Sequence, residues 1–226
     1  MKLNLTKKPK GAILITGFPG FGLVGNIVIE SLMENMKFEV IGEFDMPEFP
    51  ATVAIHKGKI VPPISIVYNK EKNLLAIHSL VNVKGFEWII VEEIAKVVKN
   101  LEIKEIISIE GVAGPTNDKL YCFNSSKFEK LGAQVIEESV IMGVTAASLL
   151  KLKNVSCLFA PTQTDLPDSR AAAKVIEFLD KYLGLKIDPN KLLLQAEISE
   201  AKVKKLMQAS EKADVDSKRK QLSYLG

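Results

Sequence analysis

The sequence has few of the residues that disulfide frameworks and metal centres require. Its 226 residues include two cysteines, two histidines and one tryptophan. Cys122 and Cys157 stand among apolar residues and form neither a C-x-x-C pair nor a metal-ligand spacing, so we expect two buried free thiols and no metal site. His56 and His78 each stand in strand-like sequence, where a hydrogen-bonded core histidine is the expectation.

Strong net charge and long apolar runs are also missing. The formal net charge is +3 at pH 7, and no basic stripe precedes the last few residues, so we expect no nucleic-acid partner. No apolar run reaches the roughly 18 residues of a membrane span. The N-terminal stretch MKLNLTKKPKG is too polar for a signal peptide. These features predict a soluble, cytoplasmic protein with no membrane partner.

Short apolar runs alternate with helical patterns along the chain, which predicts a three-layer α/β domain built on a mostly parallel sheet. Residues 11–16 and 37–45 flank a helical pattern, so we expect a β-α-β unit with a parallel pair. We divide the chain into an α/β core, a β-hairpin insert that hangs off or extends the sheet edge, a helical C-terminal segment and a flexible tail. Their expected bounds are 1–188, about 46–80 within the core, 189–216 and 217–226.

The stretch GFPGFGLVG follows the first expected strand and raises two alternatives. Gly20, Gly22 and Gly25 form a G-x-G-x-x-G, and Asp45 stands about 20 residues further on, which is the dinucleotide-binding pattern. Against a nucleotide, Pro19 removes a backbone donor, and two phenylalanines add bulk where a pyrophosphate needs open approach. The other interpretation is a structural turn that packs against protein, formed by Gly17, Pro19, Gly20, Gly22 and Gly25.

The same stretch, GFPGFGLVGNIVIESL, resembles the signature of the proteasome assembly chaperone family in its archaeal form, some members of which carry an ATP-grasp label. Further similar segments are IEGVAG, IMGVTAASLL and PDSRAAAKVIEFLDKYLGLKIDPNKL. The resemblance implies a phosphorylase- or hydrolase-like three-layer core. It also implies a non-enzymatic, homo-oligomeric chaperone that needs no cofactor. The partners that it implies are 20S proteasome α subunits or their ring.

Family members that dock on the α-ring use a C-terminal hydrophobic–tyrosine–any-residue tail. Here Tyr224 is third from the end rather than second, and Ser223 precedes it. A tail of this kind still offers one aromatic anchor, apolar neighbours, a free carboxylate and basic residues for an acidic rim. The expected partner-binding residues are Leu222, Tyr224, Leu225, Gly226, Lys218, Arg219 and Lys220. The alternative is a frayed tail whose lysines only solvate it.

Few polar groups converge in a way that suggests catalysis. Glu110 ends an expected strand, and with Arg170 it could form a base and an anion clamp. Capping and turn formation are the competing interpretation, with Asp165 or Asp168 capping a helix and Asn117 starting a turn. We therefore name no catalytic residue. The alternative function is a nucleotide- or nucleoside-binding enzyme that uses the glycine-rich loop.

Overall fold

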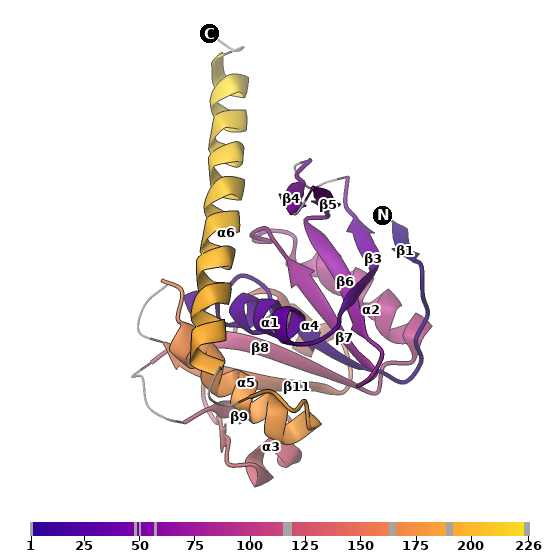
Figure 1. Ribbon diagram of the computed structural model, residues 1–226, viewed down its shortest axis with the longest axis vertical. Helices are drawn as coiled ribbons and strands as arrows, with labels where there is room; N and C mark the ends of the chain where they lie inside the picture. The colour runs from indigo at the N-terminus through magenta and orange to yellow at the C-terminus, as the bar shows by residue number, and fades with distance from the viewer. Residues whose placement is uncertain are drawn as a thin grey trace.

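A sheet of nine strands runs through the protein, and helices cover both of its faces, in the computed structural model (Figure 1). The structure describes residues 2–47, 49, 51–56, 58–114, 119–162, 166–188 and 192–223, and for residues 2–4, 45, 56, 59 and 209–223 the description is confined to the backbone. The sheet is built from β1 (Lys2–Leu5), β2 (Ile13–Thr16), β3 (Glu39–Asp45), β6 (Ile64–Asn69), β7 (Leu74–Ser79), β8 (Glu105–Ala113), β9 (Tyr121–Phe123), β10 (Gln134–Val135) and β11 (Val155–Thr162).

The remaining elements are a small separate hairpin and the helices. The hairpin consists of β4 (Ala54–His56) and β5 (Lys59–Val61). The helices are η1 (Phe21–Leu23), α1 (Val24–Asn35), α2 (Glu87–Leu101), α3 (Ser126–Lys130), α4 (Gly143–Lys151), α5 (Ser169–Leu183) and α6 (Leu192–Ser223). The three-layer α/β fold predicted from the sequence is confirmed.

The strand order is β1-β3-β6-β7-β2-β8-β11-β9-β10, and the four central strands β7, β2, β8 and β11 are parallel. The predicted β-α-β pair is wrong in one respect, because β6 and β7 lie between β2 and β3. Every residue of β7 is buried, as a central strand requires, whereas Glu39 and Val40 of β3 are exposed. The β6–β7 part of the expected insert therefore lies inside the sheet, and β4 and β5 are the described strands of the insert that stand outside it.

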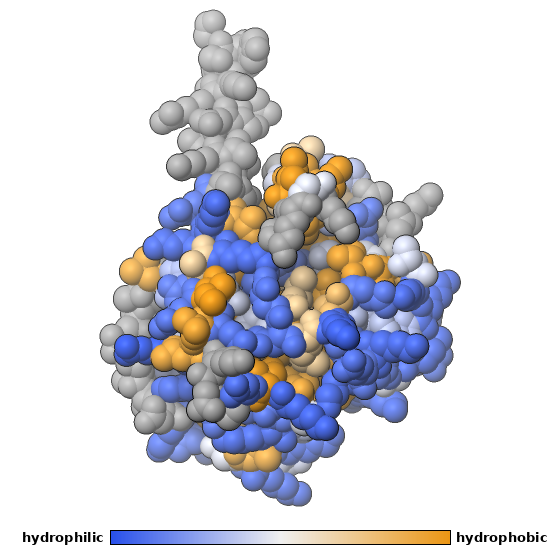
Figure 2. Space-filling view, in the orientation of Figure 1, coloured by the Kyte–Doolittle hydropathy of each residue, from blue (hydrophilic) through white to orange (hydrophobic). Residues whose placement is uncertain are grey.

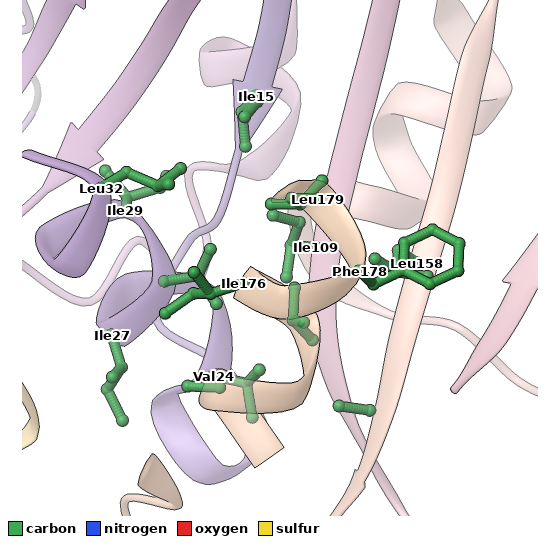
Figure 3. Close-up of a cluster of buried hydrophobic side chains, with 14 of the residues drawn as sticks. Ile15, Val24, Ile27, Ile29, Leu32, Ile109, Leu158, Ile176, Phe178 and Leu179 are labelled. Carbon is green, nitrogen blue, oxygen red and sulfur yellow. The ribbon is translucent and has the colours of Figure 1, made fainter. Parts of the chain in front are cut away.

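Each central strand supplies two cores, because alternate side chains point to opposite faces of a sheet. Along β11, Cys157 and Phe159 join the cluster beneath α2 and α4, whereas Leu158 joins the cluster beneath α1, α5 and α6. Figure 3 shows this second cluster, in which side chains of α1 and α5 meet those of β8 and β11. Residues Val24 to Leu32 of α1 are all buried, since other elements surround the helix.

The ends of α5 follow the capping signals of its sequence. The Asp168 side chain accepts a hydrogen bond from the Ala171 amide at 2.9 Å, and Gly184 ends the helix in the left-handed conformation. Glu177 and Lys181, four residues apart on the helix, form an ion pair at 2.7 Å. Trp88, near the start of α2, is 53% exposed.

Helix α6 is longer than the sequence predicts, since its backbone stays helical through residues 217–223 of the expected tail. The flexibility of 217–226 stays a prediction, and residues 224–226 lie outside the described ranges. The first half of α6 packs with the core through buried Leu192, Ala196 and Val203. Its far end projects away from the sheet (Figure 1).

Candidate functional site

The glycine-rich loop joins β2 to α1 and folds back so tightly that its two ends touch. A Cβ atom placed on Gly17 would lie 2.5 Å from the carbonyl oxygen of Gly25. One placed on Gly25 would lie 2.7 Å from both the Gly17 Cα and the Ile109 carbonyl oxygen. No side chain fits at either position, so these two glycines bring the start of α1 against β8.

The middle of the loop is held by three other elements. Gly22 has φ +63°, and a Cβ there would meet the Thr162 side chain of β11 at 2.9 Å. The Gly22 carbonyl accepts a hydrogen bond from the Asp168 amide, at the start of α5, at 2.9 Å. On β8, a Cβ added to Gly111 would overlap the Phe21 carbonyl oxygen. The backbone of the loop therefore packs against β8, β11 and the start of α5.

The placement of Asp45 does not support a dinucleotide site. A ribose-binding acidic residue belongs at the end of the strand beside the glycine-rich turn. Asp45 instead ends β3, three strand positions from β2. That offset corresponds to about 14 Å at the usual strand spacing. The motif match in the sequence therefore does not correspond to the spatial arrangement that binds a dinucleotide.

A cavity of about 700 Å³ opens beside the loop, at the carboxyl ends of the central strands. Phe18, Pro19, Gly20 and Phe21 form one wall, and the segment from Ser139 to Thr145 forms another. Glu110 also lines the cavity, and it lies within β8 and not at the strand end that the sequence predicted, because the strand continues to Ala113. Its Oε2 atom is enclosed and has no hydrogen-bond partner among the described residues.

Hydroxyl groups continue from Glu110 into the core. The Thr145 hydroxyl bonds to Glu110 and lies 2.9 Å from the Ser108 hydroxyl, which accepts from Thr16 at 3.3 Å. All three hydroxyl residues are buried. Burial raises the pKa of Glu110 to about 7, against the smaller lowering effect of the Thr145 bond. The cavity therefore holds a carboxyl group that changes charge near neutral pH.

Glu110→Gln is expected to stabilise the protein at alkaline pH and to leave it unchanged near pH 4. The folded-state pKa of about 7 lies above the ordinary 4.5, so ionisation costs stability as the pH rises through this range. Because solvent reaches part of the side chain, we expect a gain of about 2 kcal/mol above pH 8. Urea unfolding from pH 4 to 9 measures it, and a difference independent of pH would contradict it.

The other catalytic candidates do not join this cavity. Arg170 is exposed on α5 and is not among the residues that line the cavity. Asp168 is the cap of α5, as the competing interpretation held. Asp165 and Asn117 lie outside the described residues. The structure therefore does not bring together the base and anion clamp that the sequence suggested.

The predicted tail site lies at and beyond the end of α6. Lys218, Arg219, Lys220 and Leu222 belong to the projecting part of the helix, where the description covers the backbone alone. Tyr224, Leu225 and Gly226 lie outside the described residues. Their role in binding a partner stays a prediction.

A buried charge network was not predicted from the sequence. Glu30 on α1 accepts a bond from His78 on β7 at 2.8 Å and pairs with Lys202 on α6. Lys202 also bonds to Glu34 at 2.7 Å. Burial alone would raise the pKa of Glu30, but the bonds and charges of His78 and Lys202 outweigh it and hold the pKa at about 2. The network thus connects α6 to α1 and, through Glu30, to β7.

Both predicted free thiols are present, and Cys122 and Cys157 are buried. Among the described residues, no three His, Cys, Asp or Glu side chains are placed to hold a metal ion. Within the same ranges, no helix has both the length and the apolar character needed to cross a bilayer.

Comparison with known proteins places the chain in a family. An uncharacterised protein of Methanocaldococcus jannaschii is 26% identical over 224 residues, covering 94% of this chain and 92% of its own. The crystal structure of Pyrococcus furiosus PbaA, described as an archaeal homologue of proteasome-assembly chaperone, matches with a TM-score of 0.80. It is 28% identical and covers 94% of this chain and 99% of its own.

A second Pyrococcus furiosus structure, that of PbaB, shares the fold. PbaB is described as an archaeal proteasome activator and is 20% identical, with a TM-score of 0.69. The alignment covers 91% of this chain and 98% of PbaB. The sequence model of the PAC2 family matches residues 14–207. The resemblance inferred from the sequence is confirmed, and the chain belongs to the PAC2 family.

Proposed function

We propose that this protein is a non-enzymatic, cytoplasmic chaperone-like factor that binds 20S proteasome α subunits or their ring through its C-terminal tail. Membership of the PAC2 family and the likeness to PbaA over nearly the whole chain support a proteasome-related role. The structural observation that carries the tail proposal is the length and direction of α6, which runs from Leu192 to Ser223. At the usual helical rise, a helix of this size is about 48 Å long. Its end therefore stands well clear of the core (Figure 1).

An exposed apolar surface supports self-association. Val53, Ile55 and Ile60, on and beside the β4–β5 hairpin, are 54%, 76% and 74% exposed. Figure 2 shows the corresponding apolar surface over β4 and β5, on the side of the molecule from which α6 projects. Apolar groups gathered in this way are typical of protein interfaces. In a homo-oligomer several tails would be displayed together, so that weak contacts add through avidity.

Removing residues 218–226 is expected to reduce recovery of this protein on immobilised 20S core particle at least tenfold. The truncation removes the aromatic anchor, the basic residues and the terminal carboxylate together, while the packed half of α6 is kept. Tyr224→Ala and a triple alanine variant of residues 218–220 separate the anchor from the charges. Equal recovery of the full and truncated chains would count heavily against docking through the tail.

A gain-of-binding variant serves as the matched control. Deleting Gly226 moves Tyr224 to the second position from the end, and Ser223→Leu supplies the apolar residue before it, as in the tail pattern of α-ring-docking family members. The proposal expects this pair of changes to raise recovery. A scrambled tail of the same composition should bind like the truncated chain.

A further inference from the structure

The cavity beside the glycine-rich loop contains the carboxyl group of Glu110, and the proposed tail docking gives this group no role. The charged side chains among its described lining residues are Lys84, Glu87 and Glu110. Of these, Glu110 has one enclosed carboxylate oxygen that no described residue hydrogen-bonds. An ionised carboxylate in such a place is costly unless an opposite charge joins it. The site therefore repels phosphate and favours a cation.

Gly20 keeps the carboxyl group of Glu110 uncovered. Its backbone is extended, a conformation open to any residue. A Cβ on Gly20 would lie 3.4 Å from Glu110 Oε1, which is ordinary contact without overlap. Backbone conformation and backbone packing therefore do not require glycine here. What glycine provides is free space above Oε1.

The apolar residues that line the cavity indicate what kind of group could lie next to the charged end of a ligand. Phe18, Phe21 and Val112 line the cavity together with Val140 and Met142, which are 87% and 74% exposed at its rim. A ligand that fits this cavity therefore has a cationic group to pair with Glu110 and an apolar chain to contact these side chains. Because Glu110 Oε2 is enclosed, a single oxygen is left for the ligand. That arrangement suits the compact ammonium of lysine better than the two-pronged guanidinium of arginine.

We propose that this cavity binds the side chain of a lysine from a partner protein, with the apolar stem between Phe18 and Met142 and the ammonium donating to Glu110 Oε1. This site is separate from the C-terminal tail and does not depend on the proposed function. The raised pKa of Glu110 agrees with it, because a carboxyl group near its titration point ionises readily when a cation arrives.

The pH response follows from the groups around Glu110. Thr145 of α4 donates to it, and Cys157 of β11 stays neutral because burial and the Glu110 charge raise its pKa to about 12. Glu87 of α2 and Lys84 are the other charged groups among the described residues that line the cavity. Glu110 is therefore the group whose ionisation controls binding, and affinity rises with pH from about 5.5 to about 8.

The test is a titration of ¹⁵N-labelled full-length protein with Nα-acetyl-lysine N-methylamide, followed at the amides of Gly20 and Gly111. We expect saturating shifts in the millimolar range near pH 8, and at least tenfold weaker binding near pH 5.5. The matched control ligand is the norleucine derivative, which keeps the stem and lacks the ammonium, and it should not bind. Glu110→Gln and Gly20→Ala should each weaken lysine binding at least tenfold while the spectra stay dispersed.

Three results would each overturn the proposal. They are equal binding of the norleucine derivative, unchanged affinity in Glu110→Gln, and no shift of either amide at the highest lysine concentration. Binding that persists in Glu110→Gln but is lost in Gly20→Ala would mean that the cavity selects shape and not charge. Because both variants remove no buried apolar group, loss of the fold is not expected to obscure the comparison.

Discussion

Gly111→Ala is expected to lower the free energy of unfolding by about 3 kcal/mol, the upper end of the usual cost of overpacking a core. The added methyl group would overlap the carbonyl oxygen of Phe21 and come within 3.1 Å of the Thr162 side chain. The Phe21 carbonyl group cannot move away freely, because the next residue, Gly22, accepts a hydrogen bond from the start of α5. Strand β8 and the glycine-rich loop must separate to make room.

Gly114→Ala is the matched control for this experiment. It lies three residues further along the same segment, and an added Cβ would meet nothing nearer than the Pro161 Cβ at 3.8 Å. Its free energy of unfolding should stay within about 0.5 kcal/mol of the original protein. Equal effects of the two substitutions in urea unfolding would contradict the close approach of loop and strand.

Lys202→Met is expected to cost about 3 kcal/mol of stability at pH 7, because it removes one partner from a buried ion pair. Methionine keeps much of the apolar stem of lysine, so the loss reports mainly on the charge. Glu30 is only 1% exposed, and without Lys202 the His78 bond would be its one remaining side-chain bond among the described residues. The same substitution should loosen the attachment of α6, which hydrogen exchange along the helix would detect.

The control and the pH dependence distinguish this network from a surface pair. Lys181→Met breaks an exposed pair with Glu177. It should therefore change stability by only about 0.5 kcal/mol or less, as is usual for exposed pairs. The folded-state pKa of Glu30, about 2, lies below its ordinary 4.5. The network thus stabilises fully above about pH 4.5 and loses that stabilisation as the pH falls toward 2. A Lys202→Met effect that does not shrink in acid would contradict the account.

Features encoded locally could be predicted from the sequence. The turn from β2 into α1, the Asp168 cap and the Gly184 end of α5 each depend on residues within a few positions of one another. The apolar pattern also predicted the layers, because alternation and helical period determine which face of an element is buried. The resemblance to the family rested first on the glycine-rich loop between β2 and α1. Close backbone contacts at Gly17 and Gly25 leave no room for a side chain at these two positions.

Features that depend on distant pairing could not be predicted in this way. No local sequence pattern predicts that the β6–β7 hairpin lies between β2 and β3 in the sheet. The order of strands depends on contacts between residues far apart in the sequence, because the strands buried on both faces occupy the centre of the sheet. Likewise His78 and Lys202 stand 48 and 172 residues from Glu30, so no spacing motif connects them. Glu110 was expected to end a strand, but β8 continues to Ala113, and the enclosure of Glu110 Oε2 became visible only in the fold.

The most direct test of the proposed function is the mass of the full-length protein in solution, by size-exclusion chromatography with light scattering, with and without isolated 20S proteasome α subunits. The proposal predicts a shared peak whose mass exceeds that of either component and which is lost when residues 218–226 are removed. Two components that elute separately, each at its own mass over the whole accessible concentration range, would contradict it.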